Sequence, residues 1–155
     1  MSGAPERTPA VIVPMAARHR DGWEKLYRAY AAFYAVPMTN EILGRTWGWL
    51  MDPGHPEEGL AAEDADGTLV GLAHFRPYPD PLRGCDIGFF DDLFVDPSAR
   101  GRGIAHQLIE VVSTVARERG WPQVSWLTAQ DNASARALYD QLARATTWVT
   151  YEMLP

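Results

Sequence analysis

The sequence has little that would build a disulfide, a zinc site or a nucleic-acid surface. Cys85 is its one cysteine, so an intrachain disulfide and a site of paired cysteines are excluded, and we expect a reducing, cytoplasmic setting and no bound metal. Basic residues number 14 against 20 acidic ones, and this net charge of −6 is opposite in sign to that of a nucleic-acid-binding domain. We therefore expect no nucleic acid as a partner.

A long apolar run is also missing. The longest early one, residues 10–17, is interrupted by Pro14 and follows a polar start, so it fits neither a signal peptide nor a membrane span. The 155 residues, 46% of them hydrophobic, predict one domain with one core over residues 10–155, preceded by a flexible tail over residues 1–9. No membrane partner is expected.

The hydrophobic pattern predicts the order β, α, α, β, β, β, α, β, α, β. Apolar residues spaced by three or four indicate helices, short apolar or alternating runs indicate strands, and glycine and proline mark the breaks. The expected strands cover residues 10–13, 60–63, 69–75, 87–95, 124–128 and 148–153, and the expected helices cover residues 21–34, 40–50, 104–120 and 132–142.

Two turn features refine this reading. The Asp66-Gly67 pair predicts a two-residue hairpin turn of type I′, which needs positive φ angles at both central residues. Pro77, Pro79 and Pro81 are expected to interrupt the strand that precedes them.

A short segment rich in glycine and arginine, residues 100–103, lies between an expected strand and an expected helix. Unpaired N–H groups and the dipole at a helix start attract anions, and glycines let the backbone approach a phosphate closely. A tight turn with solvated arginines is the alternative interpretation. The segment lacks the Gly-Lys-Ser/Thr of an ATP-binding loop and the third glycine of a dinucleotide fingerprint, so it disfavours ATP and NAD.

Residues 100–105, Arg-Gly-Arg-Gly-Ile-Ala, match the Arg/Gln-x-x-Gly-x-Gly/Ala signature of the GNAT N-acetyltransferase superfamily. Residues 92–97 resemble the family's fourth strand, and residues 132–139 resemble its later Asn…Ala…Leu-Tyr segment. The resemblance covers nearly the whole chain and is strongest to a subgroup that includes yeast histone and polyamine acetyltransferase homologues. It implies an α/β fold with a mixed, mostly antiparallel central sheet flanked by helices, whose fourth and fifth strands splay apart.

The resemblance implies transfer of an acetyl group from acetyl-CoA to a primary amine by direct attack. It places the CoA pyrophosphate on the backbone amides of the glycine loop and the pantetheine arm along the edge of the fourth strand. Asn132 would bind the cofactor from the other side of the splay and can also cap a helix. The implied cofactor-binding residues are Leu93, Phe94, Val95, Arg100, Gly101, Arg102, Gly103, Ile104, Ala105 and Asn132.

Three residues are the implied catalytic groups. Tyr139, two helical turns after Asn132, resembles the family's general acid, which protonates the CoA thiolate. Asp91 and Asp92 are the only charges in the expected strand 87–95, and a carboxylate with a raised pKa would help deprotonate the incoming amine. In a regular strand only one of the two carboxylates can face the amine unless a bulge intervenes; we favour Asp92, with Asp91 close behind.

Several aromatic and histidine residues have a structural interpretation that outweighs a functional one. Tyr27, Tyr30, Tyr34, Trp47 and Trp49 could form an amine pocket, but aromatic residues at helical spacing are usually core. Likewise, a single strand histidine such as His74 is more often a hydrogen-bonded structural residue than a base.

The chain departs from the family pattern near its end, where the usual Gly-Phe pair after the tyrosine is missing and only one strand follows. A terminal strand leaves an edge to cover, so we expect a homodimer.

The acidic balance favours a small cationic molecule as acceptor. Acetylation of a protein lysine or N-terminus, and a non-catalytic module that senses acyl-CoA, stay open as alternatives.

Overall fold

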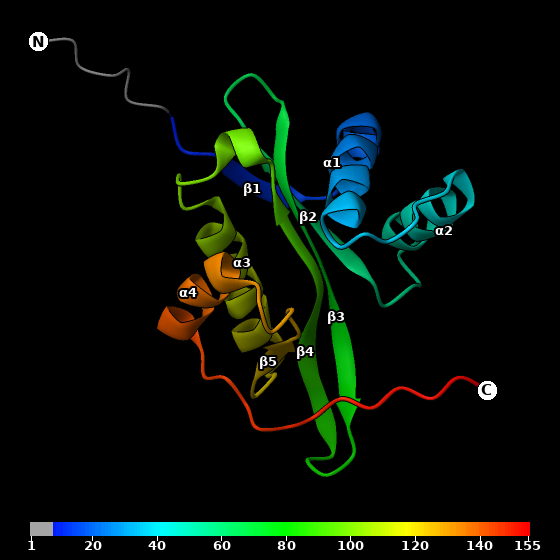
Figure 1. The fold of residues 1–155 in the computed structure, drawn as a ribbon, viewed down its shortest axis with the longest axis vertical. Helices are drawn as coiled ribbons and strands as arrows, with labels where there is room; N and C mark the ends of the chain where they lie inside the picture. Colours follow the sequence, from blue (N-terminus) through cyan, green and yellow to red (C-terminus); the bar gives the residue numbers. More distant parts are fainter. Residues whose placement is uncertain (1–7) are drawn as a thin grey trace, which may run out of the picture.

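The computed structural model describes residues 8–155, so most of the predicted tail over residues 1–9 lies outside the described residues. Five strands form one sheet in the order β1-β2-β3-β4-β5, antiparallel except for the parallel pair β4 and β5 (Figure 1). The strands are β1 (Val11–Pro14), β2 (Glu58–Glu63), β3 (Leu69–Asp80), β4 (Cys85–Val95) and β5 (Val124–Trp126), and the α-helices are α1 (Arg20–Phe33), α2 (Asn40–Met51), α3 (Ile104–Arg119) and α4 (Ala133–Leu142). The mixed, mostly antiparallel sheet is the predicted one.

Helices cover both faces of the sheet because its central strands are apolar on both sides (Figure 1). Leu72, on one face, packs with Trp23 and Leu43 of α1 and α2. Its neighbour Ala73, on the other face, packs with Leu108 of α3. The predicted helix stripes therefore bury their apolar sides against two separate core layers.

Helix ends follow the predicted chemistry. The side chain of Thr39 accepts a hydrogen bond from the backbone N–H of Ile42 and caps α2, and Gly120 ends α3 with a φ of 72°. Asp21, the expected cap of α1, lies instead inside its first turn, because a short 3₁₀ turn over Ala17–His19 leads directly into the helix.

The predicted type I′ turn is wrong. Gly67 has a φ of 82°, whereas no non-glycine residue of this turn has a positive φ. The N–H of Gly67 donates to the carbonyl of Asp64 at 2.9 Å, which closes a type I turn followed by a left-handed glycine. Asp66 has no positive φ, and its carboxylate accepts a hydrogen bond from the N–H of Thr68.

β3 runs five residues further than predicted, through two prolines. Its pairing with β2 ends at Phe75, so residues 76–80 pair only with β4. Pro77 and Pro79 both fall in this one-sided stretch, where a missing N–H is tolerated on the unpaired side. The prolines therefore mark the edge of the sheet and not the end of the strand.

The predicted last strand over residues 148–153 does not form. Residues 143–155 run as an extended segment past the β3–β4 hairpin without strand pairing (Figure 1). Trp148 and Tyr151 are each 91% exposed. A strand needs a partner edge, and this segment meets none within one described chain.

No helix of residues 8–155 is long and apolar enough to cross a membrane.

Candidate active site

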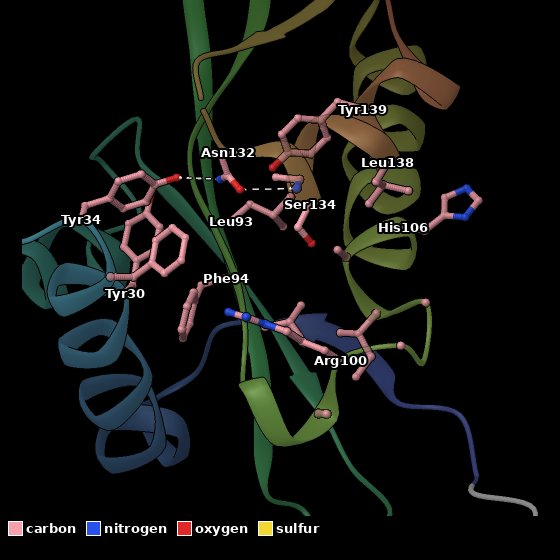
Figure 2. A pocket seen from close by; sticks show the side chains of 18 residues that line it. Tyr30, Tyr34, Leu93, Phe94, Arg100, His106, Asn132, Ser134, Leu138 and Tyr139 are labelled. Carbon is pink, nitrogen blue, oxygen red and sulfur yellow. Dashed lines mark hydrogen bonds between the residues drawn. The ribbon is translucent and has the colours of Figure 1, made fainter. Parts of the chain in front are cut away.

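A groove opens where β4 and β5 separate. The two strands pair only between Gly88 and Phe90 of β4 and residues 124–126 of β5, while β4 continues to Val95. The last five residues of β4 therefore present an edge that β5 does not cover. A cavity of about 320 Å³ adjoins this edge, bounded by α1, the start of α3 and α4 (Figure 2).

This cavity brings together nearly all the predicted cofactor-binding residues. The described residues that line it include Leu93, Phe94, Val95, Arg100, Gly101, Gly103, Ile104, Ala105, Asn132 and Tyr139. They come from β4, the glycine loop and the N-terminus of α3, which follow one another in the sequence, and from α4, which lies further along the chain. The predicted splay of the fourth and fifth strands thus creates a binding space.

The loop at the start of α3 has the geometry of an anion site. Gly101 and Gly103 have φ angles of 77° and 76°, which disfavour any other residue. The first hydrogen bond of α3 runs from the N–H of Gln107 to the carbonyl of Gly103, so the N–H groups of the helix's first turn have no partner within the helix. Those groups, together with the helix dipole, favour a phosphate at this position.

The two arginines of the loop differ. Arg100 lines the cavity, with its guanidinium 5.8 Å from the centre of the Phe94 ring. Arg102 donates instead to the carboxylate of Asp64, with an N–O distance of 2.8 Å, and to the carbonyl of Thr8. Of the predicted cofactor-binding residues, Arg102 is the one that does not line the cavity, and its side chain is held on the β2–β3 turn.

Asn132 has both of its predicted positions. Its carbonyl oxygen accepts from the N–H of Ala135 at 3.4 Å and caps α4, and its amide nitrogen donates to the hydroxyl of Tyr34, also at 3.4 Å (Figure 2). The same amide nitrogen donates to Thr128. Asn132 therefore ties α4 to α1 across the groove.

Tyr139 borders the groove from α4. Its ring packs edge-on against Trp126 of β5 with centroids 5.4 Å apart, and its hydroxyl makes no hydrogen bond to any residue in 8–155. Burial and the nearby Tyr34 raise the pKa of Tyr139 to about 12, so the phenol stays protonated at neutral pH. It can donate a proton or a hydrogen bond into the groove.

A β-bulge lets both acidic residues face the same space. In the pairing with β3, His74 is opposite Asp92 and Phe75 is opposite Phe90, so Asp91 is the extra residue. Asp91 and Asp92 both line a cavity of about 20 Å³ that Tyr139 also borders. This volume suits one water molecule.

Asp92 is surrounded by donors that sequence analysis did not connect with it. Its Oδ2 accepts from Nδ1 of His74 at 2.8 Å and from the hydroxyl of Tyr27 at 3.0 Å. The indole N–H of Trp23, 2.9 Å from Nε2 of His74, can only donate, so His74 carries its proton on Nδ1. Burial raises the pKa of Asp92, but hydrogen bonds from His74, Tyr27 and Tyr30 outweigh it and leave the pKa below its usual value. The sequence predicted a raised pKa for Asp92, but the surroundings of this carboxylate lower it.

A third carboxylate lies near the pair. Burial and the adjacent Asp91 raise the pKa of Glu57 to about 8, while Arg76, 3.7 Å away, opposes the rise. The guanidinium of Arg76 forms a two-point ion pair with Asp91, with N–O distances of 2.9 and 3.2 Å. Glu57 precedes β2 in a loop. The only feature of the sequence that could have pointed to it is its carboxylate next to an apolar strand.

Among the described residues, no group of three or more histidine, cysteine, aspartate or glutamate side chains could hold a metal ion.

Residues 21–143 of this chain match the protein family described as "Acetyltransferase (GNAT) family". The chain is 30% identical to a D-amino-acid N-acetyltransferase (HPA3) of Saccharomyces cerevisiae over 143 residues, which span 92% of this chain and 89% of that protein. It is 29% identical over 108 residues to an aminoglycoside N(6')-acetyltransferase type 1 of Salmonella typhimurium, covering 58% of this chain and 74% of that one.

Solved structures share the fold. A ribosomal-protein-alanine N-acetyltransferase of Brucella melitensis superimposes with a TM-score of 0.79 at 28% identity, covering 95% of this chain and 99% of that one. The aminoglycoside acetyltransferase AAC(6')-Iy in complex with a bisubstrate CoA analogue gives a TM-score of 0.79 at 23% identity, over 96% and 99% of the two chains.

Proposed function

Because this chain belongs to the acetyltransferase (GNAT) family, we propose that it transfers the acetyl group of acetyl-CoA directly to the primary amine of a small cationic molecule. One observation carries this proposal. Tyr139 borders both the groove with the glycine loop and the small cavity lined by Asp91 and Asp92. A thioester held in the groove thus lies beside both a proton donor and carboxylates.

The residues of the groove fit the CoA portion of the cosubstrate. The positive φ angles of Gly101 and Gly103 turn the loop so that the first N–H groups of α3 can receive the diphosphate, and Arg100 adds positive charge. The uncovered edge of Leu93–Val95 offers backbone groups to the amides of the pantetheine arm. Bound acetyl-CoA supplies an activated acetyl group as a thioester.

The proposed chemistry divides between Asp92 and Tyr139. The acceptor arrives as an ammonium ion and loses one proton to Asp92 or Asp91, directly or through a water in the 20 Å³ cavity. The amine nitrogen then bonds to the acetyl carbonyl carbon and the carbon–sulfur bond breaks. The leaving sulfur takes a proton from the hydroxyl of Tyr139, and the second amine proton, passed on through the carboxylates and water, restores the Tyr139 phenol. The products are the amide, CoA thiol and one net proton.

The lowered pKa of Asp92 makes it a weak base and a permanent anion at neutral pH. Its principal contribution is therefore to attract and orient the ammonium ion, and water carries the proton away. Asp91, paired with Arg76, is expected to contribute less.

Release of CoA thiol from acetyl-CoA across a panel of amines tests the proposal. We expect turnover with at least one small cationic amine, and we expect Tyr139→Phe to slow it at unchanged affinity for acetyl-CoA. Tight binding of acetyl-CoA with no turnover of any amine would favour the acyl-CoA sensor, and turnover confined to peptides would favour a protein acceptor.

We also propose that the chain forms a homodimer through its last residues, in the cytoplasm. Trp148, Val149, Tyr151, Met153 and Leu154 are each at least 72% exposed, and an apolar extended segment favours pairing with a second copy. Sedimentation of the full chain should give twice its mass of 17.3 kDa, and removal of residues 146–155 should give the monomer mass. A full-length monomer at micromolar concentration would contradict the dimer.

A further inference from the structure

A second large cavity lies beside the groove, between α1, the loop after it and the segment that follows β5. Its volume is about 510 Å³, which is within the range of small-molecule sites. It shares Tyr30, Tyr34, Asp92 and Thr128 with the small cavity beside Tyr139. A molecule bound here therefore meets Asp92 at the boundary between the two cavities.

The walls of this cavity are mainly apolar. Ala31, Val36, Met38, Leu127 and Ala129 supply aliphatic surface, and Leu127 and Val36, 69% and 54% exposed, lie at its mouth. Apolar walls of this kind gain from burying a carbon framework and gain nothing from hydroxyl groups or a second charge.

The hydroxyl groups of the cavity already make hydrogen bonds within the protein. Tyr27 donates to Asp92, and the nearby Tyr30 hydroxyl helps to lower the pKa of the same carboxylate. Tyr34 and Thr128 both accept from the amide of Asn132. A sugar with many hydroxyl groups would find only these few hydroxyls and one carboxylate as polar side-chain partners among the described residues of the cavity.

Among residues 8–155, Asp92 is the only charged one that lines the cavity. The arginine nearest to the acidic pair, Arg76, is held by Asp91 and Glu57 and does not line this space. One ammonium group therefore has an anionic partner, whereas a carboxylate on the same molecule would approach Asp92 with no cation to receive it.

We propose that the acceptor is a primary amine on an apolar aryl or alkyl body that carries no carboxylate and no second charge. This inference rests on the proposed acetyl transfer and names the class of its acceptor. It separates this chain from the relatives whose names specify D-amino acids or aminoglycosides. The amine nitrogen forms the new bond to the acetyl carbon next to Asp92, and the apolar body stays between the tyrosines and Val36.

A matched pair of acceptors tests the proposal most sharply. 2-Phenylethylamine and phenylalanine share the same ring and chain and differ in the carboxylate. A like charge near Asp92 should lower kcat/KM for either enantiomer of phenylalanine by about 100-fold relative to 2-phenylethylamine. Spermidine and kanamycin, which carry several charges, should also be poorer acceptors than 2-phenylethylamine.

A variant at the mouth of the cavity adds a control. Val36→Arg supplies the missing cation at an exposed position, so it should raise kcat/KM for phenylalanine relative to 2-phenylethylamine by about tenfold or more. Val36→Gln has a long polar side chain without charge and should leave that ratio close to the wild-type one.

The outcomes separate the acceptor class from the activity itself. Equal or better turnover of phenylalanine, spermidine, kanamycin or a peptide beginning with alanine would overturn the acceptor class and leave the acetyl transfer intact. If no amine is turned over, the proposed acetyl transfer is wrong. The shift in Tm that each amine causes in the presence of CoA then shows which amine the cavity binds. A shift with 2-phenylethylamine and none with phenylalanine supports the apolar amine site, and the reverse contradicts it.

Discussion

His74 makes two hydrogen bonds, and the loss of each can be measured separately. The buried imidazole accepts from Trp23 through Nε2 and donates to Asp92 through Nδ1. A glutamine amide reaches the position of Nε2, and an asparagine amide reaches that of Nδ1. His74→Gln should therefore keep the partner of Trp23 and lose the donor to Asp92, while His74→Asn should do the opposite. Both variants lose the ring, so their difference isolates the hydrogen bonds.

The magnitudes follow from burial and charge. Trp23 is fully buried, so an indole N–H without a partner in His74→Asn should cost about 1–3 kcal/mol of unfolding free energy relative to the wild type. A hydrogen bond to an ionised group is worth about 1.5–3 kcal/mol. Its loss in His74→Gln should raise the pKa of Asp92 by about 1–2 units at about 1.4 kcal/mol per unit.

Denaturant unfolding and the pH dependence of kcat/KM measure the two effects. The pKa of Asp92 is lowered in the native protein, so activity that depends on its charge is present at neutral pH and lost as the pH falls through that pKa. In His74→Gln this acid limb should move to higher pH, whereas in His74→Asn it should stay near the wild-type position. Equal pH profiles for the two variants would refute the assignment of the proton to Nδ1.

Three further predictions concern single residues. Tyr139→Phe should lower kcat about 100-fold with an unchanged calorimetric Kd for acetyl-CoA, because the ring packing stays and only the proton donor is lost; unchanged kcat would argue against the acid role. Arg100→Ala should weaken CoA binding clearly more than Arg102→Ala does, since only Arg100 lines the groove, and an equal loss would contradict the ion pair of Arg102. The pKa of Glu57 is raised from 4.5 to about 8, so the native state holds a proton that the unfolded chain releases. Stability should fall as the pH rises from about 5 to 8, and Glu57→Gln should flatten the fall in Tm.

Local patterns predicted most of the architecture. The helix of residues 104–119 has an uninterrupted apolar stripe and glycines at both ends, and it forms nearly where the sequence places it. The glycine loop and the Asn132 cap of α4 were predicted because their geometry is encoded in neighbouring residues, whereas a cofactor role for Asn132 came from the family resemblance. The pairing of the sheet determined two of the features that were predicted wrongly, the end of β3 and the last strand. Pro77 is tolerated because β2 ends opposite Phe75, and residues 148–153 meet no partner edge among the residues that the structure describes.

The electrostatics of the site depend on contacts between distant residues. Trp23, His74 and Asp92 come from α1, β3 and β4, and the bulge that places Asp91 beside Asp92 appears only in the register of two strands. A carboxylate in an apolar strand indicates that something stabilises it, but not which donors do so. The sign of the Asp92 pKa shift therefore could not be predicted from sequence spacing.

The most direct test of the acetyl transfer is to incubate the protein with acetyl-CoA and 2-phenylethylamine and to identify the amine product by mass spectrometry. We predict one acetyl group on the amine nitrogen, an equal amount of CoA thiol, and strongly reduced formation of both by Tyr139→Phe. Binding of acetyl-CoA without an acetylated product from this amine or any other in the panel would contradict the proposed reaction.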